Sequence, residues 1–336
     1  MRIGRYLLQR MLFVLPQLLG IVLVSFLLVK TIPGDPAVLM LGPTATPEAI
    51  ASLRTQMGLD QPLYTQFIIY VAHLLHGDLG MSWQTTRPVL EDLLQRFPAT
   101  LELVTYSLIL ALIVGLSLGI ASALHPRGWL ARLADVYGLS AGALPDFWFG
   151  LVLIFVFYTL AQWAPAPLGR LDIAVIAPEP VTGFMTIDTL LAGDFEAFRS
   201  AVSHLVLPVL TLGLINAGPI LKMTQSSMDK MLAADFSRYE VLCGLPHRLV
   251  ARHALRNSLP SIITIVSVLY GYLIGGAVLV EIVFSWGGAG QYAVQGVLNS
   301  DIYPVLGFVL FSAIFSLLVY IAVDLIYFLA DPRISH

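Results

Sequence analysis

The chain has 336 residues, of which 57% are hydrophobic and only 12% are charged, and its formal net charge is −3. A water-facing surface needs about twice that share of charged residues, so the composition excludes a soluble domain. It predicts an integral membrane protein.

Six apolar runs reach the roughly 20 residues with which a helix crosses about 30 Å of hydrocarbon. The first follows Arg2, Arg5 and Arg10, as a signal peptide would, but it is too long for one and lacks a cleavage pattern. We therefore expect an uncleaved first span that starts in the cytoplasm. The six predicted spans lie near residues 10–31, 100–124, 137–163, 204–223, 261–284 and 304–330.

The basic residues favour the same topology. With both termini in the cytoplasm, 12 of the 18 Lys and Arg residues fall in the inner segments. Because Lys and Arg prefer the cytoplasmic side, this asymmetry predicts a multi-pass protein with both ends inside.

The outer segment over residues 32–97 is too long to be a simple turn. We expect a small extracytoplasmic cap, with one helix from Thr46 or Pro47 to Met57 and another over residues 61–75.

Two acidic residues lie at predicted helix starts. Pro98 is expected to begin the second span, which would place Glu102 in its first turn, where a carboxylate is favourable. Pro145 is expected to open or bend the third span. Asp146 directly after it is either a buried acid in a transport pathway or the cap of a broken helix.

The fourth and fifth predicted spans carry features of a protein interior. The fourth contains Pro208, Pro219 and the polar Asn216, and a helix interrupted in this way persists in lipid only where neighbours satisfy its backbone. In the fifth, Gly275 and Tyr270 indicate either close helix approach or a lumen. The candidate pathway-lining residues are Asp146, Asn216, Tyr270 and Gly275.

The segment from Met228 to Pro260 is long, polar and basic. It predicts two short helices joined at an angle, because no Gly or Pro occurs before Gly244, which can stop a helix, and Pro246 suits the first turn of the next. Arg248, Arg252 and Arg256 fall on one face of that second helix. These arginines either extend to lipid headgroups or form part of a surface that docks on a cytoplasmic partner.

Motifs of catalysis are missing from the sequence. It contains no phosphate-binding loop with Lys, no H-E-x-x-H, no G-x-S-x-G and no C-x-x-C. His73 and His76 lack a third ligand, so packing is favoured over a metal site. We expect no catalytic residue, no metal, no cofactor of the chain's own and no nucleic-acid partner.

Several stretches spread over essentially the whole chain carry a family resemblance. They are IPGDP (32–36), GLDQPLYTQF (58–67), GDLGMSW (77–83), PATLEL (98–103), FSW (284–286), HALRNSLP (253–260) and VDLIYFLADPRI (323–334). Through them the chain resembles the permease subunits of bacterial ABC importers for dipeptides, oligopeptides and nickel, in particular the first (B-type) permease.

The resemblance implies an all-α fold, the transmembrane domain of a type I ABC importer, with six transmembrane helices and an extracytoplasmic insertion after the first. It divides the chain into residues 1–31 with the first helix, the cap 32–97 and the core 98–336. The loop 228–260 would then be the coupling region that inserts into an ATPase. Its expected contact residues are Arg238, Tyr239, Glu240, Gly244, Leu245, Pro246, Arg248 and Arg252.

The same resemblance implies partners and a location. These are a second homologous permease, two ABC ATPase subunits that hold ATP and Mg²⁺, an extracytoplasmic binding protein, and the bacterial cytoplasmic (inner) membrane. In one respect this chain differs from the family. Members usually carry a run like R-T-A-R-A-K before this glycine, whereas here RYEVLC precedes Gly244.

Short peptides are the expected substrates, and nickel chelates, glutathione-like compounds or small glycosides are alternatives. A rival hypothesis is a self-contained secondary transporter that uses an ion gradient through Asp146, Glu281 or Asp324. A membrane enzyme is poorly supported because no catalytic pair is found.

Overall fold

The computed structural model describes residues 16–28, 36–42, 45–56 and 58–330, which form two compact units. The first unit comprises the described residues up to 97 together with 292–318, and the second comprises residues 98–291 and 319–330. Apart from one isolated β-bridge between Met81 and Pro88, the regular structure in the described residues is helical. The side chain of Asp324 lies outside what the structure describes.

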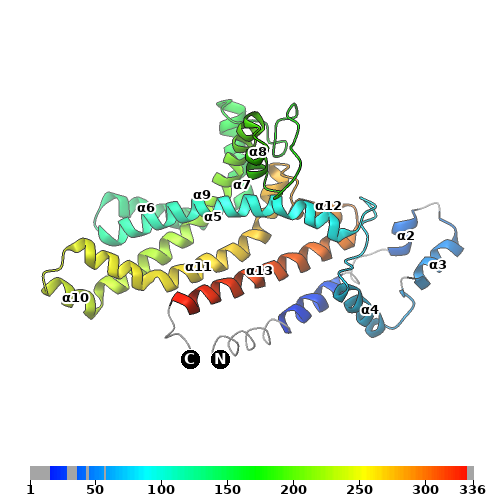
Figure 1. Ribbon diagram of the computed structural model, residues 1–336, viewed down its shortest axis with the longest axis horizontal. Coiled ribbons are helices and arrows are strands. Elements are labelled where there is room, and N and C mark those ends of the chain that lie inside the picture. Colours follow the sequence, from blue (N-terminus) through cyan, green and yellow to red (C-terminus); the bar gives the residue numbers. More distant parts are fainter. Residues whose placement is uncertain (1–15, 29–35, 43–44, 57, 331–336) are drawn as a thin grey trace. The chain divides into compact units, whose positions relative to one another are not determined.

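The described helices range in length from 6 to 39 residues, and Figure 1 labels those named α2 to α13. They are Pro16–Leu28, α2 (Pro36–Leu41), α3 (Pro47–Gln56), α4 (Leu63–Leu75), α5 (Val89–Leu124), α6 (Trp129–Ala141), α7 (Asp146–Leu153), the π-helix η1 (Ile154–Leu160), α8 (Met185–Leu191), α9 (Phe195–Ala233), α10 (Asp235–Leu242), α11 (His247–Val283), α12 (Ala289–Leu298) and α13 (Ile302–Ala330).

Four of the described helices are long and apolar enough to cross a membrane, namely α5, α9, α11 and α13 up to Val323. They correspond to the second, fourth, fifth and sixth predicted spans. The third predicted span is bent by 109° between α6 and α7–η1, so that it is a broken span or a re-entrant pair. The bend at Pro145 was expected, because proline disfavours a helical residue before it. The first predicted span falls partly outside the described residues.

The long helices extend beyond their apolar runs. The prediction that the second span starts at Pro98 is wrong, because α5 begins at Val89 and Pro98 lies inside it. Helix α9 is continuous through Pro208 and Pro219, and 67% of its apolar window is buried, in agreement with the expectation that this span lies in the protein interior. It begins at Phe195, where the Asp194 carboxylate accepts a hydrogen bond from the Ala197 amide (2.9 Å).

Helix α9 forms the centre of the second unit. It contacts α6, α7, α8, α10 and α11. Helix α5 approaches it through glycines, because a Cβ at Gly115 would lie 2.8 Å from the Cβ of Ile220, and one at Gly119 would lie 2.7 Å from the Cβ of Thr224. Small residues at such crossings allow the backbones to come close, which is how helices associate tightly in lipid.

Buried hydrogen bonds and aromatic contacts hold the first unit together. Asp92 is 2% exposed and accepts hydrogen bonds from Thr85 (2.5 Å) and Tyr292 (2.9 Å), while Ser82 donates to Asp301 (2.6 Å). The two helices expected within residues 32–97 are confirmed as α3 and α4.

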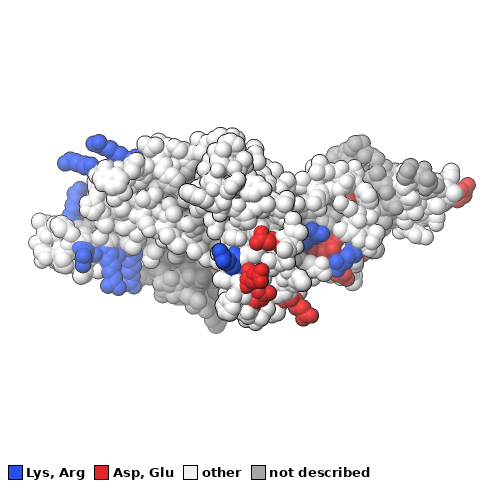
Figure 2. Space-filling model, turned by 90° about the horizontal axis from the view of Figure 1, so that it is seen from above, with Lys and Arg blue, Asp and Glu red and all other residues white. Residues whose placement is uncertain are grey.

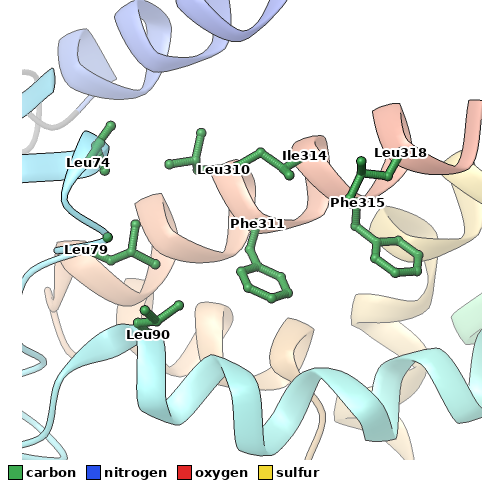
Figure 3. A pocket seen from close by; sticks show the side chains of 9 residues that line it. Leu74, Leu79, Leu90, Leu310, Phe311, Ile314, Phe315 and Leu318 are labelled. Atoms are coloured by element: carbon green, nitrogen blue, oxygen red, sulfur yellow. The ribbon is translucent and has the colours of Figure 1, made fainter. Parts of the chain in front are cut away.

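Figure 3 shows a pocket of about 250 Å³ in the same unit. Because leucine, isoleucine and phenylalanine side chains dominate its lining, it offers no side chain that could orient a charged solute. The labelled lining residues are Leu74, Leu79, Leu90, Leu310, Phe311, Ile314, Phe315 and Leu318.

We expect Gly115→Ala to destabilise the protein, because its methyl group would collide with Ile220 and with the carbonyl oxygen of Ala217. Overpacking of this kind costs about 1–3 kcal/mol, more than the helix propensity that alanine gains. The measurement is the thermal unfolding midpoint in detergent. The matched control is Gly20→Ala, whose Cβ would meet nothing within 4 Å. Equal midpoints for the two variants would contradict close packing at Gly115.

Candidate functional site

An elbow of the second unit, residues 234–256, joins two long helices. Helix α9 ends at Ala233, Ala234 is extended (φ −68°, ψ 155°), α10 follows, and α11 begins after Pro246. The prediction of one helix from Met228 to Cys243 is therefore wrong. The break at Ala234 is stabilised by Ser237, whose hydroxyl donates a hydrogen bond to the carbonyl of Met231 (2.8 Å). The second helix is also longer than predicted, since α11 continues to Val283.

Gly244 stops α10 as predicted. Its φ is +78°, a left-handed conformation that glycine adopts without strain. The Gly244 amide donates to the Val241 carbonyl (3.0 Å), and the Leu245 amide donates to the Glu240 carbonyl (3.1 Å). This pair of bonds is the Schellman motif, which satisfies the last carbonyls of a helix.

The surface of the elbow is exposed and basic. Most of the predicted coupling residues are exposed, Tyr239 among them at 70%, and the neighbouring Leu242 is 86% exposed. Figure 2 shows that Lys and Arg gather over the end that carries α6 and α10. Of the predicted set, Arg238, Tyr239, Gly244, Pro246, Arg248 and Arg252 are exposed, and Glu240 and Leu245 are half-buried.

One side-chain hydrogen bond joins the two arms of the elbow. The Glu240 carboxylate of α10 lies 2.7 Å from the Nδ1 atom of His253 in α11. Beneath it, Val250 and Ala254 of α11 are buried. Arg248, Arg252 and Arg256 share the exposed side of α11, as their spacing predicted.

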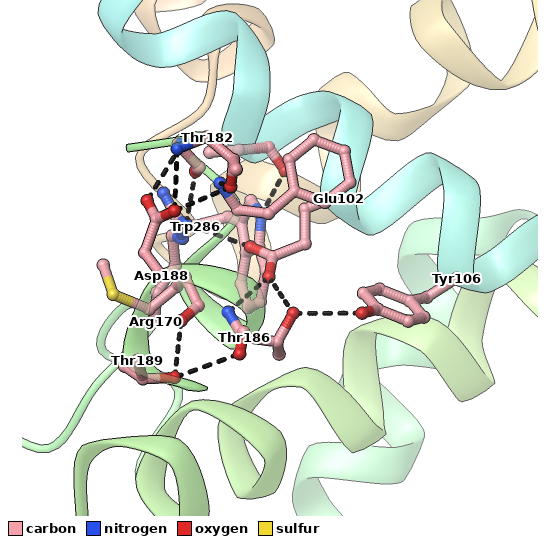
Figure 4. Close-up of polar contacts among 12 residues, drawn as sticks. Glu102, Tyr106, Arg170, Thr182, Thr186, Asp188, Thr189 and Trp286 are labelled. Carbon is pink, nitrogen blue, oxygen red and sulfur yellow. Dashed lines mark hydrogen bonds and ion pairs between the residues drawn. The ribbon is translucent and has the colours of Figure 1, made fainter. Parts of the chain in front are cut away.

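A buried ion pair lies elsewhere in the second unit, as Figure 4 shows. Glu102 is 1% exposed and pairs with Arg170 (3.0 Å), and its other oxygen accepts hydrogen bonds from the Thr186 amide (2.8 Å) and hydroxyl (2.7 Å). The prediction that a helix N-terminus stabilises Glu102 is wrong, because α5 begins at Val89. Arg170 was missed because it follows a Pro-rich run with no local signal.

The segment that carries Arg170 is fixed by further polar contacts. Burial lowers the pKa of Arg170, and the neighbouring Glu102 carboxylate opposes this. Asp188 accepts hydrogen bonds from the Thr182 amide and hydroxyl (both 2.7 Å) and from the Gly183 amide (2.9 Å). Although its burial acts to raise the pKa of Asp188, these hydrogen bonds lower it below its ordinary value.

Glu281 lies near the end of α11 and is fully buried. Its carboxylate accepts hydrogen bonds from the Thr100 hydroxyl (2.5 Å) and the Gln291 amide (2.8 Å). A Cβ at Gly288 would lie 2.4 Å from Glu281 Oε1, so the loop after α11 approaches this carboxylate closely. These contacts give Glu281 a place in the packing of α5, α11 and that loop.

The candidate pathway residues occupy different environments. Asp146 is half-buried in the first turn of α7, and Asn216 is buried, with its amide donating to the Leu212 carbonyl (2.8 Å). Tyr270 is half-buried and lies 3.3 Å from the Thr105 hydroxyl. Gly275 is exposed, and a Cβ there would meet nothing within 4 Å. Each of the four residues therefore has its own local environment, and the contacts given above join none of them to another.

The two histidines of the predicted cap have separate partners. His73 lies 2.9 Å from Asp78, and His76 lies 2.7 Å from the Ala72 carbonyl. Among the described residues, no cluster of three or more His, Cys, Asp or Glu side chains could hold a metal ion.

Comparisons with known proteins identify the family. Residues 115–336 match the family described as "Binding-protein-dependent transport system inner membrane component", and residues 3–104 match its N-terminal companion. The chain belongs to this family. It is the B-type permease component of a binding-protein-dependent ABC importer, a multi-pass protein of the inner membrane.

Curated relatives of this permease family cover nearly the whole chain. A probable D,D-dipeptide transport system permease protein of Escherichia coli K12 is 42% identical over 94% of this chain and 93% of the relative. The dipeptide permease of the same strain is 37% identical over 99% of both chains. A glutathione transport system permease protein of Salmonella paratyphi A is 34% identical over 98% of this chain and 99% of the relative.

Membership in this family gives the chain its place in the importer. A component of such a system works with an ATPase, a binding protein and another permease, and the permease is the conducting part, not the catalytic part.

We expect Arg170→Met to lower the permease's stability by about 3–5 kcal/mol, because it leaves the Glu102 carboxylate buried without its partner. The double variant Glu102→Gln/Arg170→Met is expected to lose less, since the buried charge is removed. Thermal unfolding of the purified permease measures both. Arg54→Met is the control, because the Arg54–Asp60 pair is 39% and 50% exposed and is worth about 0–1 kcal/mol. Additive losses in the double variant would contradict a buried ion pair.

Proposed function

We propose that this permease forms half of the translocation pathway for short peptides, paired with a second homologous permease. Two ATPase subunits would bind ATP and Mg²⁺ on the cytoplasmic side, and an extracytoplasmic protein would deliver the peptide. The observation that carries the proposal is full-length similarity to permeases named for dipeptides, D,D-dipeptides and glutathione. These solutes share amide bonds and charged ends, so a short peptide fits better than a glycoside or a nickel chelate.

The proposed orientation places the elbow and both termini in the cytoplasm. The elbow exposes Arg238, Arg248, Arg252 and Arg256, and basic residues favour the cytoplasmic side of a membrane. The proposed cap at residues 32–97 and the segment that carries Arg170 then lie outside, where the binding protein arrives.

We assign to the elbow the role of coupling this chain to an ATPase. Its exposed side chains are available to a partner, and the short α10 stands between the ends of α9 and α11. Helix α11 has 37 residues, and at 1.5 Å per residue it is about 55 Å long. A displacement of α10 is therefore transmitted along a continuous helix to the far end of the span.

One exposed face of α11 is the proposed pathway wall. Thr264, Val268, Tyr272, Gly275 and Leu279 recur at intervals of three or four residues, and all are exposed. Such spacing places them on one side of a helix. The open space at Gly275 favours a lumen or the second permease at this position over close packing within the chain. Tyr270, Asp146 and Asn216 would stand behind this face and shape it.

The single cysteine of the chain provides a direct test of docking. Cys243 is exposed at the end of α10, so a bound ATPase that covers it is expected to slow its labelling by a maleimide in the assembled importer. The control is Ile173→Cys in a Cys243→Ala background, because Ile173 is 89% exposed and lies in the proposed outer segment. Protection at Cys243 alone is expected. Equal labelling with and without the ATPases would argue that the elbow faces no such partner.

Gly244→Val should uncouple ATP hydrolysis from uptake. A β-branched residue at φ +78° strains the turn by about 1–2 kcal/mol and displaces α10. We expect loss of both dipeptide uptake and the stimulation of ATPase activity by the loaded binding protein.

The matched control for that variant is Gly193→Val. Gly193 ends α8 at φ +69° with the same pair of hydrogen bonds, and neither glycine has an atom within 4 Å of an added Cβ. The backbone strain is thus equal, and only the position differs. If both variants lost uptake to the same degree, the elbow would have no special part in coupling.

A further inference from the structure

Helix α10 has little apolar surface with which to hold its position. It has eight residues, of which only Ser237 is buried, while Val241 and Leu242 are 48% and 86% exposed. Isolated helices of this length are unstable in water, and most helices gain their stability by burying an apolar face. The orientation of α10 must therefore depend on a few directional contacts.

Three sets of hydrogen bonds hold α10, and each set fixes a different part of the elbow. The bond from Ser237 to the Met231 carbonyl ties the start of α10 to the end of α9. The Schellman bonds at Gly244 close the end of α10 on itself. The bond between Glu240 and His253 (2.7 Å) crosses the turn and ties α10 to the second turn of α11.

This Glu240–His253 contact is partly shielded from water. The Glu240 side chain is 19% exposed and that of His253 is 38% exposed. A hydrogen bond to a carboxylate is stronger than one between neutral groups, and partial burial preserves more of that strength than full exposure would. The bond bridges 13 residues of sequence, so it fixes the angle between two helices that otherwise meet at Gly244 and Pro246.

We propose that Glu240 and His253 form a clasp that holds the coupling helix α10 rigidly on α11. The inference rests on the proposed coupling role of the elbow and assigns positioning residues within it. While the Glu240–His253 bond is formed, a displacement of α10 by the ATPase also displaces α11. With the clasp open, α10 turns about Gly244 while the ATPase stays bound, so ATP is consumed with less peptide moved.

The clasp is tested in the complete importer reconstituted in liposomes, with dipeptide uptake and ATP hydrolysis measured together. Glu240→Ala and His253→Ala should each lower the number of peptides moved per ATP by roughly three- to tenfold, while ATP hydrolysis continues. The double variant should be no worse than either single variant, because the two residues act through one bond. Glu196→Ala and His125→Ala, which change exposed residues outside the elbow, are the matched controls and should leave the ratio unchanged.

Hydrogen exchange of residues 235–245 supplies a readout that does not depend on transport. Each single alanine variant should raise the exchange of this segment roughly three- to tenfold, and the reciprocal variant Glu240→His/His253→Glu should restore both slow exchange and coupling. If a single alanine variant fails to assemble into the importer, the reciprocal variant decides the case. Restored assembly in the reciprocal variant would support the clasp, and continued failure to assemble would overturn it.

Two further results would overturn the clasp. One is an unchanged ratio of peptide to ATP in the single variants, and the other is additive loss in the double variant. Failure of the proposed function looks different: the unmodified importer would then move no peptide on ATP addition, while exchange at residues 235–245 would still respond to Glu240→Ala.

Discussion

The structure depends on close contact between long helices around α9. Glycines at positions 115 and 119 let α5 lie against Ile220 and Thr224, and Gly218 brings α6 close to α9. Without these small residues, the backbones would separate and the buried polar groups of the second unit would lose their partners. Tyr137, for example, reaches the Leu214 carbonyl of α9 from α6. In lipid this matters more than in water, since dispersion contacts and hydrogen bonds replace the hydrophobic effect as the force between helices.

Charged groups in this permease follow two different patterns. In the elbow the arginines are exposed, whereas Glu102 and Glu281 are buried and hydrogen-bonded, Glu102 to the half-buried Arg170 and Glu281 to Thr100 and the Gln291 amide. The second pattern bears on the rival idea of an ion-coupled transporter. A carboxylate that exchanges protons during transport needs access to water, and Glu281 is instead enclosed by Thr100 and the loop at Gly288. The exposed arginines therefore support a role in binding a partner. The buried Glu102 and Glu281 instead stabilise the packing of the second unit.

Much of this arrangement could be predicted from residue types, and the remainder depends on contacts distant in sequence. Hydropathy located the long helices, and the glycine at position 244 and the arginine spacing after it gave the outline of the elbow, because these signals are local. The partner of Glu102 is 68 residues away in an irregular segment, so no periodicity could reveal it. Pro208 and Pro219 indicated a span that needs packed neighbours, and α9 is continuous through both and largely buried. The break at Ala234 has no Gly or Pro to signal it.

The Glu240–His253 contact gives a physical explanation for the unusual run RYEVLC before Gly244. Where the resembling permeases carry small and basic residues, this chain has Glu240, whose carboxylate is turned inward to His253, and Val241 and Leu242, which are exposed. The charge of Glu240 therefore lies in the joint between α10 and α11, and not on the exposed face of α10. On the proposed function, the ATPase groove that receives this α10 should be more apolar than a groove that binds a basic helix, and the basic contacts should pass to Arg248 and Arg252 on α11. Helix α11 would then take part in docking directly, and not only as the arm that α10 moves.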